Sequence, residues 1–284
     1  MKKILVTGAT GFIGNYVVAE LLKSGHQVIA SSANAVNAGN KDWFKKVEYI
    51  QFDFAGFDNS KNYFEFFHSP DLMIHLAWEG LPNYTSNFHL EINLPRHEML
   101  LKNLVSNGLT NLTVTGTCLE YGFQEGKLDE SMLAKPSNPY AIAKNQLRES
   151  LQEFEKDYPF NFKWVRLFYM YGKGQNPNSL LSQLDKALAN EDQAFNMSGG
   201  EQLRDYLPVE SVAKNIVAIA LQQKVTGIIN CSSGTPVKVK DFVEQYLKEK
   251  NKTIKLNLGH YPYTSYEPMA FWGDNKKLKT ILND

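Results

Sequence analysis

The stretch Ile4-Leu-Val-Thr-Gly-Ala-Thr-Gly-Phe-Ile-Gly14 runs from apolar residues through three glycines towards a helical pattern. Ile4 to Val6 are apolar and two of them are β-branched, which is typical of a strand buried on both faces. Asn15 to Lys23 then carries apolar residues at helical spacing. A glycine turn between such a strand and helix lets a pyrophosphate approach the backbone, where free N–H groups and the helix dipole meet its charge. The stretch therefore predicts nucleotide binding.

The spacing of the glycines narrows the kind of turn. Gly8, Gly11 and Gly14 form Gly-x-x-Gly-x-x-Gly, whereas the commonest dinucleotide-binding domains use Gly-x-Gly-x-x-Gly. Three glycines could also form a simple sharp connection, but the strand before them and the helix after them favour a nucleotide. We expect the following residues of this loop to line the cofactor: Gly8, Thr10, Gly11, Phe12, Ile13 and Gly14.

The composition argues against several classes of protein. The 284 residues, 43% of them hydrophobic, suffice for one large domain or a domain with a lobe. Because 30 basic residues balance 30 acidic ones without a basic run, we expect no nucleic-acid partner. No apolar stretch suits a membrane span or a signal peptide. Cys118 and Cys231 do not have the spacing of metal ligands, and two cysteines without a partner pattern suit a reducing compartment. We expect a cytoplasmic enzyme with no metal and no membrane partner.

Strand and helix patterns alternate along the chain, which predicts an α/β fold with a doubly wound parallel sheet of the Rossmann type. The pattern loosens after residue 168, so we expect a dinucleotide-binding domain over 1–168 and a smaller C-terminal substrate-binding lobe over 169–284. Part of the lobe, about 205–231, is expected to return to the first domain. The expected strands are 4–6, 27–30, 47–52, 72–77, 112–114, 164–168 and 227–231, and the expected helices are 15–24, 63–67, 94–107, 180–188, 212–221 and 240–248.

The end of the second expected strand bears on the choice of cofactor. An acidic residue there would bind the adenosine ribose and repel a 2′-phosphate, but the chain has Ser31 and Ser32. Their hydroxyls, with Lys41 or Lys45 nearby in the sequence, could hold a phosphate, although no arginine is present. This favours NADP (NADPH) and leaves NAD possible.

A tyrosine and a lysine four residues apart indicate the chemistry. On a helix Tyr140 and Lys144 share one face, so the ammonium can lower the pKa of the phenol while the phenol exchanges a proton with substrate. The same spacing recurs at Tyr169–Lys173 and Tyr246–Lys250. The former crosses a glycine-containing loop and the latter lies among charged residues, whereas Tyr140 opens a helix shortly after a strand-end hydroxyl. We therefore interpret Tyr140 as the catalytic tyrosine.

Several motifs occur in one order along the chain, and together they resemble a known family. They are Thr7 to Gly14, Asp53 after the third strand, His75-Leu-Ala-Trp78, Thr117, Tyr140-x-x-x-Lys144 and Arg204-Asp-Tyr206. The chain resembles, over essentially its whole length, the extended short-chain dehydrogenase/reductases (the NAD-dependent epimerase/dehydratase family) that act on nucleotide-activated sugars.

The resemblance implies a role for each motif. Thr117 would hydrogen-bond the substrate oxygen, Tyr140 would donate or accept the proton, and Lys144 would bind the nicotinamide ribose and tune the tyrosine. Arg204 would bind the diphosphate of the sugar nucleotide. Beyond the glycine loop, the implied cofactor-binding residues are Ser31, Ser32, Asp53, Phe54, Leu76, Ala77, Trp78, Thr115, Tyr140 and Lys144, and the implied substrate-binding residues are Thr117, Tyr140, Tyr169, Asn178 and Arg204.

Departures from the family's motifs narrow the reaction. The 4,6-dehydratases place Asp and Glu after the catalytic threonine, where this chain has Cys118 and Leu119, so dehydration is disfavoured. Relatives like GDP-fucose synthase use a cysteine at the position of Leu119, and Cys118 is one residue too early to share its face, so we interpret Cys118 as structural. Tyr169 replaces an asparagine common in 4-epimerases.

What remains is carbonyl reduction or alcohol oxidation. The motifs Ala77-Trp78 and Gly116 to Gly122 most resemble the nucleotide-sugar 4-ketoreductases, the group of CDP-abequose synthase and the dTDP-4-keto-6-deoxyhexose reductases. This implies NADPH-dependent reduction at C4 of a nucleotide-linked 4-keto-6-deoxyhexose, in deoxysugar or cell-surface polysaccharide biosynthesis. The alternatives are a 4-epimerase with tightly held NAD and a non-catalytic NAD(P)-sensing protein. The family also implies a homodimer, formed through helices such as Leu94–Asn107 and Tyr140–Phe154.

Overall fold

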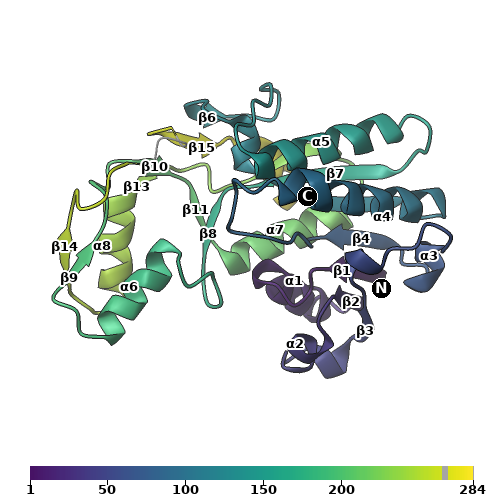
Figure 1. Cartoon of the computed structure of the whole chain (residues 1–284), viewed down its shortest axis with the longest axis horizontal. Helices are drawn as coiled ribbons and strands as arrows, with labels where there is room; N and C mark the ends of the chain where they lie inside the picture. The colour runs from purple at the N-terminus through teal and green to yellow at the C-terminus, as the bar shows by residue number, and fades with distance from the viewer. Residues whose placement is uncertain (264–267, 284) are drawn as a thin grey trace.

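A computed structural model describes residues 1–263 and 268–283 of the chain. Its centre is a parallel sheet of seven strands in the order β12-β7-β5-β4-β1-β2-β3 (Figure 1). The predicted doubly wound α/β fold is therefore confirmed. The sheet strands are β1 (Lys3–Thr7), β2 (Gln27–Ser32), β3 (Glu48–Gln51), β4 (Leu72–His75), β5 (Asn111–Thr117), β7 (Asn161–Leu167) and β12 (Gly227–Cys231).

Helices cover both faces of this sheet, as the alternation of strands and helices requires (Figure 1). Ile4 and Val6 of β1 pack into a core with α1, α7 and α9, while Leu5 points into a second core with α4 and α5. The helices are α1 (Phe12–Lys23), α2 (Ala35–Gly39), α3 (Tyr63–Phe66), α4 (Leu94–Ser106), α5 (Pro139–Phe154), α6 (Leu180–Ala189), α7 (Val209–Leu221), α8 (Val239–Glu249) and α9 (Lys276–Leu282).

The later part of the chain divides between the central sheet and a lobe beside it. After α7, strand β12 pairs with β7 of the sheet, whereas α6 and α8 form a separate apolar core with the pair β9·β14 (Figure 1). Short two-stranded sheets lie outside the central sheet. Their strands are β6 (Gly126–Leu128), β8 (Tyr169–Tyr171), β9 (Ala194–Asn196), β10 (Leu203–Arg204), β11 (Tyr206–Pro208), β13 (Val237–Lys238), β14 (Lys255–Asn257) and β15 (Phe271–Gly273).

Two elements extend further than their local patterns predict. Strand β5 continues to Thr117, because it pairs with β7 up to the Thr117–Leu167 register, so Thr115 and Thr117 lie within the strand. Tyr169 belongs to β8, which pairs with β11, and not to a loop. In both cases a partner strand from a distant part of the sequence supplies the backbone hydrogen bonds.

The strand order reverses between β1 and β4, and ligands of doubly wound folds bind beyond the strand ends at such a point. The glycine turn lies there. Gly8 has a φ of +71°, and a Cβ atom on it would lie 2.7 Å from the Ala77 nitrogen after β4. A Cβ on Gly14 would lie 2.1 Å from the Gly8 oxygen. The sequence therefore needs glycine at both positions, because two backbone segments approach each other too closely for a side chain.

We predict that Gly14→Ala will lower the midpoint of thermal unfolding and weaken the binding of a dinucleotide. The added methyl group overlaps the Gly8 carbonyl, and overpacking of this kind costs about 1–3 kcal/mol. The matched control is Gly39→Ala, because a Cβ on Gly39 meets no atom within 4 Å. Calorimetric unfolding and binding titrations that show equal effects for both variants would contradict the interpretation.

Candidate active site

The glycine turn and helix α1 form a site suited to an anion. Gly11 is the N-terminal cap of α1, no side chain caps the helix, and its first turn carries no acidic residue. The uncapped N–H groups and the helix dipole therefore favour a negatively charged group. Together with the close backbone approach at Gly8 and Gly14, this is the environment that the pyrophosphate of a dinucleotide requires.

The carboxyl end of β2 carries the two serines expected near the adenosine ribose. Ser31 is buried, and its carbonyl accepts a hydrogen bond from the Ala9 N–H at 3.1 Å. The Ser32 hydroxyl lies 3.0 Å from the Tyr49 hydroxyl, which also donates to the Ser32 carbonyl at 3.0 Å. The Ser32 side chain is thus already engaged by Tyr49, which lessens its capacity to hold a phosphate.

Trp78, just beyond β4, is the centre of a group of stacked rings. Its indole N–H donates to His89 Nδ1 at 3.1 Å, and its ring stacks on His97 with centroids 4.7 Å apart. The buried Phe54 ring lies against the other side of His97, at 4.2 Å between centroids. Asp53, the residue before it, is exposed and caps the backbone of Ala55. These contacts hold Trp78 rigidly at the edge of the candidate site.

Thr117, Tyr140 and Lys144 come together at the carboxyl end of β5. The Thr117 hydroxyl is close enough to the Tyr140 phenol to lower the pKa of that phenol. Lys144 donates to the Thr115 carbonyl at 2.9 Å, and its ammonium lies 4.0 Å from the centroid of the Trp78 ring. Asn138 caps the start of α5 and thereby sets Tyr140 in its first turn, one helical turn before Lys144. The structure thus brings the three predicted catalytic residues into one group.

The pKa values of this group differ from the sequence-based expectation. Burial raises the pKa of the Tyr140 phenol, the facing Tyr84, Glu120 and Cys118 raise it further, and only the Thr117 hydrogen bond lowers it. Burial also lowers the pKa of Lys144 to about 7, against an opposing effect of Glu120. The net effect of the surroundings is therefore to raise the pKa of Tyr140, whereas the sequence predicted that Lys144 would lower it. The protein alone keeps the phenol protonated, which is the form that can donate a proton.

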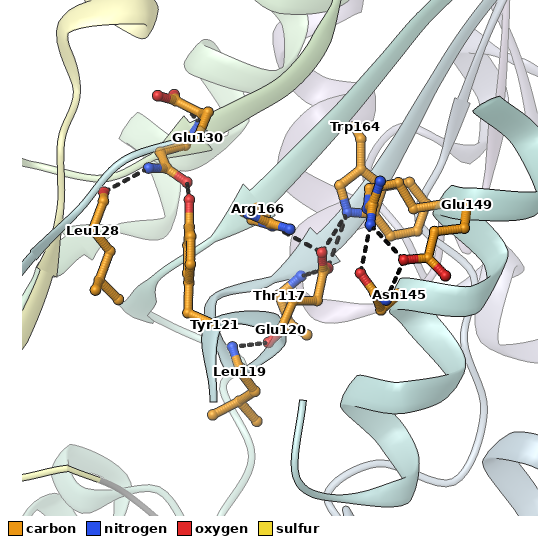
Figure 2. A network of polar contacts seen from close by, with 12 residues as sticks. Thr117, Leu119, Glu120, Tyr121, Leu128, Glu130, Asn145, Glu149, Trp164 and Arg166 are labelled. Carbon is orange, nitrogen blue, oxygen red and sulfur yellow. Dashed lines mark hydrogen bonds and ion pairs between the residues drawn. The ribbon is translucent and has the colours of Figure 1, made fainter. Parts of the chain in front are cut away.

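Glu120 is a buried carboxylate that fixes the turn carrying Thr117 (Figure 2). It accepts hydrogen bonds from the Thr117 N–H at 2.8 Å, from the Trp164 indole at 2.9 Å and from Arg166 Nε at 2.8 Å. In return the Thr117 hydroxyl accepts from the Leu119 N–H at 3.2 Å, which completes a capping box. Gly116 must be glycine, because a Cβ there would lie 2.1 Å from the Trp164 nitrogen.

The substrate-binding residues expected from the resemblance are more scattered. The buried Arg204 guanidinium packs on the Phe271 ring at 4.6 Å and near the Tyr169 ring at 5.8 Å, and donates to the Leu203 and Met269 carbonyls. Asn178 is exposed in the loop before α6, where its carbonyl accepts from Gln183. The structure joins Arg204 and Tyr169 but shows no contact of Asn178 with either.

The other tyrosine–lysine pairs have different surroundings. Tyr246 of α8 and Lys250, the residue after this helix, both bind Asp185 of α6, at 2.8 Å each, so they connect α8 to α6. Tyr169 packs against Tyr206 and Phe271. Tyr169 belongs to strand β8 and Lys173 to the turn after it, so these two side chains do not share one helix face as Tyr140 and Lys144 do.

Sequence reasoning missed several residues of this site. Thr117-x-x-Glu120 matches the capping-box pattern after a strand and could have indicated the role of Glu120. Tyr84, His89 and His97 carry no such local signal, because their contacts with Trp78 and Tyr140 arise only in the folded chain. Cys118 and Cys231 are both free and buried, and Cys118 packs with Tyr121, while the structural role of Cys118 stays a prediction.

Over 1–263 and 268–283, no group of His, Cys, Asp or Glu residues has an arrangement that could hold a metal ion. Within the same ranges, none of the helices combines the length and the apolar character that crossing a membrane requires.

With the fold and this group in place, comparison with known proteins identifies the class. Residues 4–232 match the model of the NAD dependent epimerase/dehydratase family, and the chain belongs to that family. The dTDP-6-deoxy-L-talose 4-dehydrogenase (NAD(+)) of Aggregatibacter actinomycetemcomitans is 32% identical, over 95% of this chain and 98% of its own length. A UDP-glucuronate 4-epimerase of Thermodesulfobacterium geofontis is 27% identical, over 100% of this chain and 91% of its own.

Solved structures share the same fold. The UDP-glucuronic acid 4-epimerase of Bacillus cereus, in complex with UDP-glucuronic acid and NAD, superposes with a TM-score of 0.83 at 24% identity. This likeness covers 99% of this chain and 93% of that one. The dTDP-glucose 4,6-dehydratase DesIV of Streptomyces venezuelae gives a TM-score of 0.81 at 20% identity, over 98% and 90% of the two chains.

We predict that Glu120→Gln will destabilise the fold by about 3–5 kcal/mol, because it leaves the buried Arg166 guanidinium without its counter-charge. The matched control is Glu149→Gln, which removes the exposed carboxylate that pairs with Arg148 and should cost about 0–1 kcal/mol. Urea unfolding at neutral pH measures the free energy of unfolding of both variants and of the wild type. Equal losses in the two variants would show that Glu120 has no special structural role.

Proposed function

We propose that the protein interconverts a ketone and an alcohol at C4 of a nucleotide-linked 6-deoxyhexose, acting as a 4-ketoreductase in the reducing direction. The observation that carries this proposal is that Thr117 lies beside Tyr140 at the carboxyl end of β5, with Lys144 one helical turn away. The name of the 32% identical relative, a dTDP-6-deoxy-L-talose 4-dehydrogenase, supports this substrate class. We also propose that residues 1–168 bind the dinucleotide and that 169–284 bind most of the substrate.

In this mechanism each residue of the group has one task. NAD(P)H, when bound on the glycine turn, supplies the hydride. Thr117 donates a hydrogen bond to the carbonyl oxygen, and the protonated Tyr140 gives that oxygen its proton as negative charge develops there. In the proposal Lys144 binds the nicotinamide ribose and stabilises Tyr140 after proton transfer, and its contacts with the Thr115 carbonyl and the Trp78 ring support this role.

The surroundings of Tyr140 support C4 redox chemistry over elimination of water. Dehydration needs a second acid–base pair besides the tyrosine. The carboxylate that acts on Tyr140 among the described residues is Glu120, whose two oxygens already accept hydrogen bonds from Thr117, Trp164 and Arg166. Cys118 is buried in an apolar cluster, and Leu119 cannot titrate. The interconversion of a ketone and an alcohol, in contrast, needs only one residue that carries a proton.

A 4-epimerase with retained NAD is the second candidate, and the 27% identical UDP-glucuronate 4-epimerase favours it. It would use the same tyrosine but return the hydride to the same sugar. Two measurements on the purified protein distinguish the candidates. Retained cofactor absorbance without net NAD(P)H consumption on 4-keto sugars indicates the epimerase, and stoichiometric consumption indicates the reductase. The formation of a homodimer remains a prediction from the resemblance, and light scattering can check it.

We predict that Tyr140→Phe will reduce kcat by about 10²–10⁴ while dinucleotide affinity stays within a factor of about three, because only the proton donor is lost. The matched control is Tyr246→Phe, from the same Tyr-x-x-x-Lys spacing in the lobe, which should retain full activity. Steady-state turnover of NAD(P)H with a panel of CDP-, dTDP-, GDP- and UDP-linked 4-keto sugars provides the assay. Near-normal turnover of Tyr140→Phe would overturn the proposed function.

For the cofactor, we propose that NADH and NADPH bind with affinities within about tenfold of each other. The β2 end has no acidic residue to repel a 2′-phosphate, which favours NADPH, but Tyr49 engages Ser32, and the relative's name carries NAD(+). Parallel fluorescence titrations with NADH and with NADPH measure the two affinities. We expect Ser32→Asp to weaken NADPH binding by at least about tenfold and NADH binding little, because the carboxylate repels only the phosphate. A preference above about a hundredfold in the wild type would contradict this proposal.

A further inference from the structure

Tyr84 lies in the loop that joins β4 to α4, far in sequence from the other candidate catalytic residues. The loop passes in front of the first turn of α5, and two successive carbonyl groups hold it there. The Asn83 carbonyl accepts a hydrogen bond from His89 Nε2 at 2.8 Å, and the Tyr84 carbonyl accepts one from the Tyr140 N–H at 3.1 Å. Tyr84 is therefore tied directly to the backbone of the candidate proton donor.

The histidine that holds this loop is itself fixed by the site. His89 is completely buried, and its Nδ1 accepts the hydrogen bond from the Trp78 indole at 3.1 Å. Its ring also packs edge-on against Tyr140, with centroids 5.3 Å apart. The loop backbone at Tyr84 thus has a defined position relative to Trp78 and Tyr140, so a side chain carried there meets a ligand in a fixed geometry.

The side chain of Tyr84 reaches from solvent to the proton donor. The Tyr84 and Tyr140 rings are tilted, with centroids 5.5 Å apart, and the two phenols interact electrostatically. Yet 39% of Tyr84 is exposed, against 8% of Tyr140. Tyr84 is therefore accessible from solvent next to the buried Tyr140, so a ligand that approaches Tyr140 from solvent can also reach Tyr84.

We propose that Tyr84 is a substrate-binding residue whose hydroxyl binds the sugar hydroxyl next to the reacting carbon. This rests on the proposed function, because Tyr140 then marks C4. In a 6-deoxyhexose C5 carries a methyl group, so the neighbouring hydroxyl is the one on C3. A phenol both donates and accepts hydrogen bonds, which suits a sugar hydroxyl. Tyr84 thereby contributes to the choice of substrate.

The test compares Tyr84→Phe with the wild type, because this change removes one oxygen and keeps the ring that packs near Tyr140. Tyr158→Phe is the matched control, since Tyr158 is 45% exposed and lies beyond the far end of α5. KM and kcat are measured with the 4-keto-6-deoxy sugar nucleotide that the wild type reduces best, and with its 3-deoxy analogue. Dinucleotide affinity is measured alongside.

We expect Tyr84→Phe to raise KM for the full substrate about tenfold, as loss of one hydrogen bond does, with kcat changed less than about threefold. The 3-deoxy analogue should give the same KM with both proteins, and dinucleotide affinity should not change. An unaltered KM, or an equal loss with the 3-deoxy analogue, overturns the inference while the function stands. A large fall in kcat at constant KM also overturns it, in favour of a role in proton transfer. A wild type that turns over none of the sugars overturns the proposed function and this inference with it.

Discussion

The carboxylate of Glu120 has no exposed surface, and the charge it carries would be costly there without its partners. Arg166 supplies the counter-charge at 2.8 Å, while the Trp164 indole and the Thr117 N–H fill the remaining acceptor positions (Figure 2). These contacts connect the turn after β5 to the neighbouring strand β7. Because the geometry leaves no freedom at Thr117, its hydroxyl faces Tyr140 before any ligand is involved. The negative charge also helps to keep both Tyr140 and Lys144 protonated.

A second constraint comes from the reversal of strand order between β1 and β4. The reversal brings the turn at Gly8 against the backbone of Ala77, so an anion bound at the start of α1 lies beside the segment that carries Trp78. Trp78 in turn supports the ammonium of Lys144 on its face. The glycine turn and the group of Thr117, Tyr140 and Lys144 thus share one edge of the sheet, where the segment Ala77–Trp78 contacts both.

The remainder of the site depends on the loop of Tyr84 and on the lobe. Arg204 and Tyr169 converge on Phe271, although these three residues come from separate small strands. In the proposed function Tyr140 is the one proton carrier, and the loop of Tyr84 and the lobe contribute to the choice of substrate. Sites built on such additions to a common sheet let one fold serve several reactions.

The sequence by itself determined the features that depend on local periodicity: the strand–glycine–helix start, the alternation that makes a doubly wound sheet, and the shared helix face of Tyr140 and Lys144. These follow from sequence because burial repeats every two or every 3.6 residues. Only the tertiary structure decided the full length of β5, the rise of the Tyr140 pKa in place of the expected fall, and the grouping of Tyr84 and Glu120 around it. Pairing, desolvation and charge depend on segments that meet in space, such as Glu120 and Arg166, 46 residues apart, and no local pattern records such neighbours.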